Sequence, residues 1–183
     1  NYSASMGNIF SIMNRFEESE ACFRESLAVS EGSGNSRMIA SALTGLGTLN
    51  QKTGALDQAE TFFQRASRMN QRAGNLAGQA QALVGIAEVS LLRGIPENSL
   101  KPVDDAGKLA AAGGDLQASI DIRFLRSRVL LALGRPEEAL EVYRDACLEA
   151  DQRGITISGI QTRKILEDEL RERGIQISTS AER

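Results

Sequence analysis

The sequence predicts an all-α right-handed α-solenoid of four antiparallel helix-pair repeats, followed by a C-terminal capping helix. Three observations lead to this fold. The chain matches itself when it is shifted by 40 residues, and the match recurs without a gap over four copies. Each copy holds two stretches with the apolar spacing of an amphipathic helix, and no segment shows the sustained alternation of a β-strand.

The repeat is carried by small and aromatic residues in fixed places. The stretches GALDQAETFFQRA (54–66) and GRPEEALEVYRDA (134–146) both begin with Gly and then place Ala, an aromatic residue and Ala at the same intervals. The coinciding positions are Asn14, Gly54, Gly94 and Gly134; Ser19, Ala59, Ser99 and Ala139; Phe23, Phe63, Val103 and Tyr143; Ser26, Ala66, Ala106 and Ala146; and Gly34, Gly74, Gly114 and Gly154. Small residues let two helices cross closely, and the aromatic fills the space toward the next helix. One pair cannot cover its own apolar face, so the unit must recur.

The ends of the helices follow from local chemistry. In the second copy Leu43, Leu46 and Gly47 lie on one helical face. Gly54 then ends this helix as a left-handed cap, and Asn75 is a good N-cap for a later one. The same reasoning predicts helices at 2–14, 16–31, 36–53, 56–72, 76–93, 96–112, 116–133 and 136–152.

The predicted domain spans residues 1–174, with repeats at about 1–34, 35–74, 75–114 and 115–154. Proline in the first helical turn marks two of the helix starts, at Pro96 and Pro136. Residues 157–173 form a charged amphipathic helix without the small-residue pattern, which predicts the capping helix that a stack needs. Residues 175–183 are expected to be a flexible tail. The phase of the repeat also predicts a further segment before residue 1.

These residues resemble the tetratricopeptide repeat family. The resemblance lies in Leu46-Gly47, Gly54, Ala59, Phe63 and Ala66, and GRPEEALEVYRDA is the closest match. It covers about residues 1–154. The period of 40 residues departs from the common 34 and resembles the longer-helix members of the group. The tyrosine that is usual in the first helix of each unit is replaced, in chain order, by Phe10, Asn50, Ser90 and Leu130, so Asn50 and Ser90 either need polar partners or lie nearer the surface.

Composition argues against several functions. The 21 basic and 24 acidic residues nearly balance, which does not favour a nucleic-acid partner. The longest apolar runs are too short to span a membrane. The chain has no His, and Cys22 and Cys147 form neither a zinc site nor a disulfide framework, so no metal, no cofactor and no catalytic residue is expected. Two buried thiols favour a reducing, cytoplasmic location.

The resemblance implies a non-catalytic protein-interaction module whose groove holds a peptide or a helix of a partner protein. The first helix of each unit lines the groove in this family. When the groove positions of the family are assigned by their place in the 40-residue repeat, the resemblance implies these groove residues: Asn8, Ser11, Ile12, Thr44, Thr48, Gln51, Lys52, Val84, Glu88, Leu91, Leu92, Phe124, Arg128 and Leu131. We do not expect capture of a C-terminal carboxylate, because Ala4, Val84 and Glu88 stand where that type of array carries polar and basic residues.

Three questions stay open at this point. The apolar half of the groove either receives a partner or is covered by the last helix of this chain. The cluster of Arg123, Arg126 and Arg128 either binds an acidic partner segment or forms a solvated face paired with Asp121 or the next helix. Two other functions also fit this architecture: a ligand-sensing domain that regulates an attached effector, and a self-association module that forms homo-oligomers.

Overall fold

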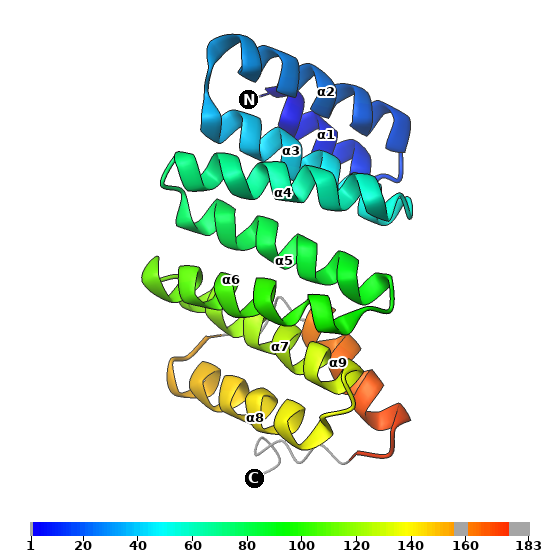
Figure 1. Ribbon diagram of the computed structural model, residues 1–183, viewed down its shortest axis with the longest axis vertical. Coiled ribbons are helices and arrows are strands. Elements are labelled where there is room, and N and C mark those ends of the chain that lie inside the picture. Colours follow the sequence, from blue (N-terminus) through cyan, green and yellow to red (C-terminus); the bar gives the residue numbers. More distant parts are fainter. Residues whose placement is uncertain (1, 156–160, 176–183) are drawn as a thin grey trace.

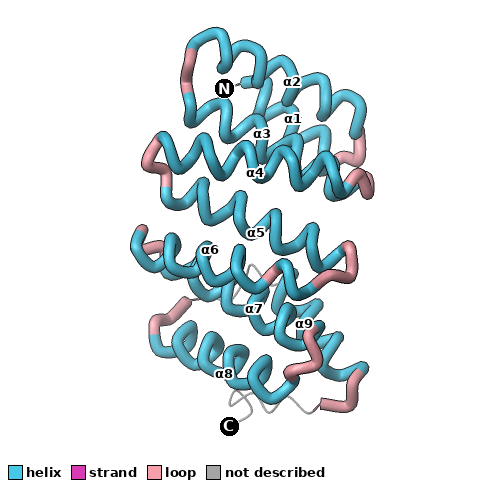
Figure 2. Tube along the Cα trace, in the orientation of Figure 1, coloured by secondary structure: helices cyan, strands magenta, loops and turns pink. Residues whose placement is uncertain are grey.

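The helices stack one after another along a single long axis (Figure 1). The structure is a computed structural model that describes residues 2–155 and 161–175. The predicted fold class is confirmed, because helices packed as adjacent antiparallel pairs make up the described chain, and no strand occurs in it (Figure 2). In chain order these helices are α1 (Tyr2–Ile12), α2 (Phe16–Ser33), α3 (Ser36–Lys52), α4 (Leu56–Arg72), α5 (Leu76–Leu92), a 3₁₀ turn η1 (Pro96–Asn98), α6 (Leu100–Ala112), α7 (Leu116–Ala132), α8 (Pro136–Gln152) and α9 (Gln161–Glu172).

The helices end at a strict interval of 20 residues. A residue with positive φ follows every α-helix, beginning with Asn14 and Gly34 and ending with Gly174. The N–H group of the next residue donates to the carbonyl oxygen five residues earlier, as Ala55 does to Asn50 at 2.8 Å and Asn75 to Asn70 at 2.9 Å. This hydrogen bond is the Schellman motif, which satisfies a carbonyl left over at a helix end. The predicted roles of Gly54 as a left-handed cap and of Asn75 as an N-cap are confirmed.

The sixth helix differs from its predicted range of 96–112. A 3₁₀ turn at Pro96–Asn98 comes first, and α6 begins only at Leu100. The reason is Pro102, which has no N–H group and would clash with the carbonyl of Asn98 in a continuous α-helix. Starting the helix at Leu100 places Pro102 in the first turn, where it is tolerated.

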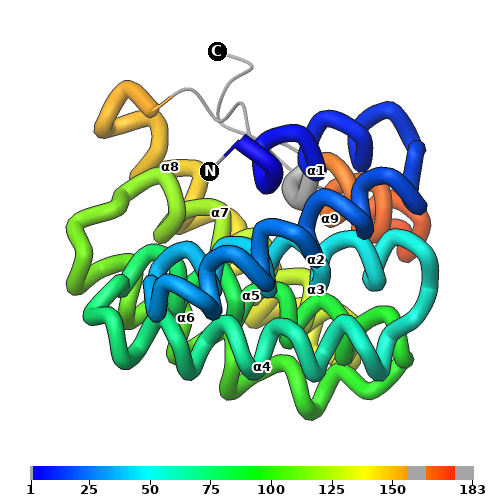
Figure 3. Tube along the Cα trace, turned by 90° about the horizontal axis from the view of Figure 1, so that it is seen from above, coloured from blue at the N-terminus to red at the C-terminus, as the bar shows by residue number. Residues whose placement is uncertain are grey.

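The odd-numbered helices form an inner layer and the even-numbered helices an outer one. Each odd-numbered helix contacts the next odd-numbered helix, whereas no contact joins successive even-numbered helices within the described residues. The array is therefore narrower on the odd-numbered side and curves toward it. Figure 3 looks along the long axis and shows α8 on a different side of that axis from α4, because successive pairs are rotated.

Aromatic rings of the even-numbered helices pack against glycines of the odd-numbered helices on both sides. The ring of Phe23 on α2 lies against Gly7 of α1 and Gly45 of α3. A Cβ atom at Gly45 would lie 2.3 Å from a ring carbon of Phe23, so no other residue fits there without movement. Phe63 on α4 has the same relation to Gly47 and Gly85. These contacts confirm the packing that the small-residue pattern predicts.

Serine hydroxyls join the two helices of a pair where they cross. Ser19 Oγ donates to the carbonyl of Gly7 at 2.8 Å, and Ser99 Oγ donates to that of Ala87 at 2.9 Å. In the fourth pair the serine is on the other helix, and Ser127 Oγ donates to the carbonyl of Ala139 at 2.5 Å. A serine hydroxyl thus links the two helices where they cross, whichever of the two carries the serine.

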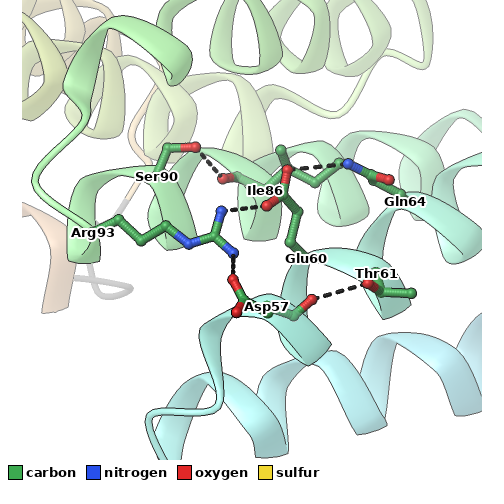
Figure 4. Close-up of polar contacts among 7 residues, drawn as sticks. All are labelled: Asp57, Glu60, Thr61, Gln64, Ile86, Ser90 and Arg93. Atoms are coloured by element: carbon green, nitrogen blue, oxygen red, sulfur yellow. Dashed lines mark hydrogen bonds and ion pairs between the residues drawn. The ribbon is translucent and has the colours of Figure 1, made fainter.

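The two polar residues at the usual tyrosine position are buried rather than near the surface. Asn50 Nδ2 donates to the carbonyl of Leu46 at 2.8 Å, and Ser90 Oγ donates to that of Ile86 at 3.1 Å. Each therefore finds its polar partner on its own helix. Figure 4 shows Ser90 beside Arg93, whose guanidinium forms ion pairs with Asp57 at 2.6 Å and with Glu60. Arg93 in this way ties the end of α5 to the start of α4.

Helix α9 closes the stack. Leu166 and Leu170 are fully buried in a core cluster with Tyr143 of α8 and with Phe124 and Leu131 of α7. The rings of Phe124 and Tyr143 have centroids 5.7 Å apart. The capping helix is thus observed at Gln161–Glu172; residues 157–160 of its predicted range and residues 176–183 of the predicted tail lie outside the described residues. In the described part of the chain, none of the helices combines the length and the apolar character needed to cross a membrane.

Candidate functional site: the inner face

The inner face of the array carries two hollows, which lie side by side and share Thr48. The polar hollow has a volume of about 1000 Å³ and lies along the first halves of α3, α5 and α7. The mixed hollow has a volume of about 470 Å³ and lies at the other ends of these helices, where Ile165 of α9 also contributes. The two hollows, together the recess of the inner face, adjoin at exposed Thr48, which lines both.

Most of the groove residues predicted from the sequence lie in these hollows. The polar hollow contains Asn8, Thr44, Thr48 and Val84. The mixed hollow contains Thr48, Gln51, Lys52, Glu88, Leu91, Leu92 and Arg128. Ser11 is buried at the edge of the inner face, and exposed Ile12 lines neither hollow.

Two predicted groove residues are not on the surface. Phe124 is 1% exposed and Leu131 is fully buried, since Leu166 and Leu170 of α9 pack in the same core cluster. The prediction that these two side chains line an accessible groove is therefore corrected. The apolar part of the inner face that stays accessible is smaller and consists of Leu91, Leu92 and Ile165, of which Leu92 is 59% exposed.

The structure adds residues that the sequence interpretation missed. Ser41, Gln81 and Asp121 line the polar hollow one helical turn before Thr44, Val84 and Phe124. These three residues occupy equivalent positions in three successive copies. Residues three positions apart lie on the same face of a helix, so the predicted groove residues Thr44, Val84 and Phe124 already indicated them. Arg37 and the N-cap residues Asn75 and Asp115 complete the polar lining.

Polar contacts join neighbouring odd-numbered helices across this face. Gln51 Nε2 donates to Glu88 at 3.0 Å, which links α3 to α5. Lys52 Nζ donates to Ser11 Oγ at 3.2 Å, which links α3 to α1. Lys52 is exposed, and Gln51 and Glu88 are partly exposed. Polar groups of a bound ligand could therefore take the place of either hydrogen-bond partner in these two contacts.

The carboxyl group of Asp121, which lines the polar hollow, has a shifted pKa. Burial raises the pKa of Asp121 above its ordinary value, and the nearby charge of Asp115 acts in the same direction. Hydrogen bonds that Gln117 Nε2 donates to both carboxylate oxygens at 3.3 Å oppose this effect. A hydrogen-bond donor or a positive charge stabilises the ionised form of a carboxyl group whose pKa is raised by burial. Asp121 is therefore a favourable contact for an N–H group of a ligand.

The three arginines of α7 pair with three different helices. Arg123 donates to Glu149 of α8 at 2.6 Å, Arg126 to Asp104 of α6 at 2.8 Å, and Arg128 to Glu169 of α9 at 3.3 Å. The hypothesis that the cluster pairs with Asp121 or the next helix is confirmed for Arg123 alone, whose partner lies on α8. Arg126 pairs instead with the preceding helix α6, and Arg128 pairs with α9. Among the residues that the structure describes, no group of three or more Cys, Asp or Glu could hold a metal ion.

Comparisons with known proteins agree with this geometry. Models of the tetratricopeptide repeat match residues 2–72 and residues 120–152. Among solved structures, the chain is similar to a crystal structure of nearly identical TPR-like repeats assigned to a kinesin light chain of Podosopora anserina. The TM-score is 0.70 over 93% of this chain and 83% of that chain, at 12% sequence identity, so the likeness concerns the fold. A search of curated proteins finds no match.

Proposed function

Because this chain belongs to the tetratricopeptide repeat family, we propose that it is a non-catalytic module that binds a peptide segment of a partner protein on its inner face. Tetratricopeptide repeats generally mediate protein–protein interaction or scaffolding. The proposal includes a role in a larger regulatory or scaffold protein and the cytoplasmic location that the two thiols favour. The observation that carries it is the pair of adjoining hollows on the inner face, which offer amide and hydroxyl side chains and an accessible apolar strip.

The two hollows suit different parts of such a peptide. Asn8, Thr44, Gln81 and Thr48 offer donors and acceptors that can follow a peptide backbone whatever its side chains are. Leu91, Leu92 and Ile165 offer a surface for one bulky apolar side chain. The charged residues Lys52, Glu88 and Arg128 line the same hollow. In protein interfaces, a few anchor side chains that fill a pocket contribute most of the binding energy, and the contacts around them exclude water.

A peptide selection with a matched pair of variants tests this proposal. We would select binders from a displayed library of random peptides and measure their affinity for the unaltered chain and for Thr48→Arg. Thr48 is exposed at the junction of the two hollows, so an arginine there obstructs both of them. We expect the affinity to fall at least about tenfold, which corresponds to roughly 1.4 kcal/mol.

The control is Thr61→Arg, which places the same change on the exposed outer side of α4. It should leave the affinity unchanged, and circular dichroism should show equal helix content for both variants. Peptides that bind both variants as well as the unaltered chain would show that the recess is not the binding site.

A further inference from the structure

A third hollow lies between outer helices of the array and shares one lining residue, Ile122, with the polar hollow. This outer hollow, with a volume of about 460 Å³, is enclosed by α6, α7 and α8. Its lining comprises Val103, Asp104, Gly107, Ala111, Gly114, Leu116, Ser119, Ile122, Arg123, Arg126, Glu149 and Arg153. The even-numbered helices α6 and α8 do not contact each other, so α7 forms the floor between them.

Comparison with the earlier copies shows that charged residues have replaced a core at this place. Arg123 occupies the position of Leu43, and Arg126 occupies that of Leu46; both leucines are fully buried. Glu149 likewise stands where the second copy has Met69, which packs against a core cluster. A single solvated charge on the surface would need no explanation, but three replacements around one space make a polar rim where the second and third copies have apolar residues.

The space itself arises from smaller residues on α6. The third copy has Val103 where the first two have Phe23 and Phe63, and it has Gly107 where the first has Leu27. A Cβ atom at Gly107 would meet only Ile122 Cγ2, at 3.7 Å, so the site has room for a larger side chain. The other helical glycines that face a core aromatic ring have no such room. The floor of the outer hollow is thus apolar and open.

The polar rim of the outer hollow is made of arginines and carboxylates, and the charge of Arg126 also acts on Glu138, which lies outside the lining. Three guanidinium groups, of Arg123, Arg126 and Arg153, face two carboxylates. Glu149 is shared, because it pairs with Arg123 at 2.6 Å and with Arg153 at 3.9 Å, and Arg126 pairs with Asp104 at 2.8 Å. Each guanidinium has five N–H donors, so these pairs leave donors unused. A ligand carboxylate can accept hydrogen bonds from these unused donors, and charge-assisted hydrogen bonds of this kind are stronger than those to an uncharged group.

We propose that the outer hollow binds a small monocarboxylate with an apolar body. The carboxylate would accept hydrogen bonds from the arginines of the rim, and the apolar body would lie on Gly107, Ala111 and Leu116, which are at least partly exposed. The volume is at the lower end of the range for small-molecule sites. A bound ligand would touch α6, α7 and α8 together, and it would thereby fix the spacing of two outer helices that otherwise do not meet.

The test uses phenylacetate as the probe and the uncharged phenylacetamide as its match, at equal ionic strength. We expect saturable changes in the backbone amide NMR signals of Gly107, Ala111 and Ser119 with phenylacetate, because these residues line the outer hollow and neither hollow of the inner face. The amide should bind at least about tenfold more weakly, since it lacks the charge-assisted hydrogen bonds. Equal affinity for both probes, or the absence of saturable changes on these helices, would overturn the proposal.

Two variants test separately whether binding requires the arginine charge and whether it requires the empty volume of the hollow. Arg126→Ile restores the residue that Ile86 provides in the third copy, so the chain should fold and lose at least about tenfold in affinity for phenylacetate. Gly107→Leu restores the residue that Leu27 provides in the first copy; it leaves every arginine in place and should abolish binding by filling the hollow.

Arg135→Gln serves as the control, because Arg135 pairs with Glu138 on the surface and does not line the hollow. It should bind phenylacetate like the unaltered chain. Binding that survives both Arg126→Ile and Gly107→Leu would refute the outer hollow as the site. The outcome is independent of the peptide experiment, since no residue of the outer hollow changed here lines the mixed or the polar hollow.

Discussion

At the scale of single residues, the pairing of aromatic rings with glycines sets how closely neighbouring helices approach. Phe63 fills the space between Gly47 and Gly85, while Val103, which is smaller, packs in a cluster with larger partners, Ala87 and Leu125. The side-chain volume between neighbouring helices therefore comes from the even-numbered helix in one copy and partly from the odd-numbered helices in another. Such compensation is expected where interiors are densely packed and each added methylene group is felt.

This pairing predicts that Gly85→Ala destabilises the fold. Alanine normally favours a helix over glycine by about 0.5–1 kcal/mol, but its Cβ atom here would lie 2.6 Å from ring carbons of Phe63. Overpacking of this kind costs about 1–3 kcal/mol, so the loss should exceed the gain. The free energy of unfolding in urea should fall.

Gly32→Ala is the matched control for that change. Gly32 lies near the end of α2, and nothing is found within 4 Å of its Cβ position. Only the helix preference remains there, and the variant should be more stable than the unaltered chain. If both alanine variants were stabilising, the close approach of Phe63 to Gly85 would be ruled out.

At the scale of the helices, α9 behaves as a member of the stack rather than as an appendage. Leu166 and Leu170 continue the 40-residue phase of Leu46 and Asn50, and their side chains complete the core of the last pair. Tyr143 Oη also donates to Glu167 of α9 at 2.5 Å. The same helix hides Phe124 and Leu131 from the inner face, so the end of the array and the extent of the recess are determined together.

We therefore expect Leu166→Ala to cost about 2–5 kcal/mol, the usual range for a buried leucine. Leu148→Ala on α8 is the control; this leucine is 54% exposed, and its loss should change stability by no more than about 0.5 kcal/mol. Thermal unfolding monitored by circular dichroism checks both. Equal, small effects would mean that α9 does not contribute to the folded core.

The helices were predictable where local chemistry decides them and less so where distant contacts do. Gly54 and Asn75 act on their own helix ends, so their roles could be inferred from a few neighbouring residues. The start of α6 was misjudged although its cause, Pro102, is local, because the earlier proline at 96 gave the stronger start signal. The burial of Phe124 and Leu131 depends on Leu166 and Leu170, about 40 positions away, and phase alone could not decide it.

At the scale of the whole molecule, the array is a sum of similar junctions between neighbouring helices, and its inner face is continuous because those junctions repeat. The polar and mixed hollows follow from the same repetition, since they use equivalent positions of α3, α5 and α7. The outer hollow arises where the repetition fails, at the arginines of α7. Two surfaces of one stack thus offer different chemistry, one for a peptide and one for a small anion.

The central claim is that the inner face, built by the odd-numbered helices, is the binding surface. The most direct test is photo-crosslinking of a selected peptide that carries a benzophenone side chain, with the adducts located by mass spectrometry. We predict adducts on α3 and α5, near Thr44, Thr48 and Leu92, which line the recess. Adducts confined to the outer helices α2, α4 and α6 would contradict it.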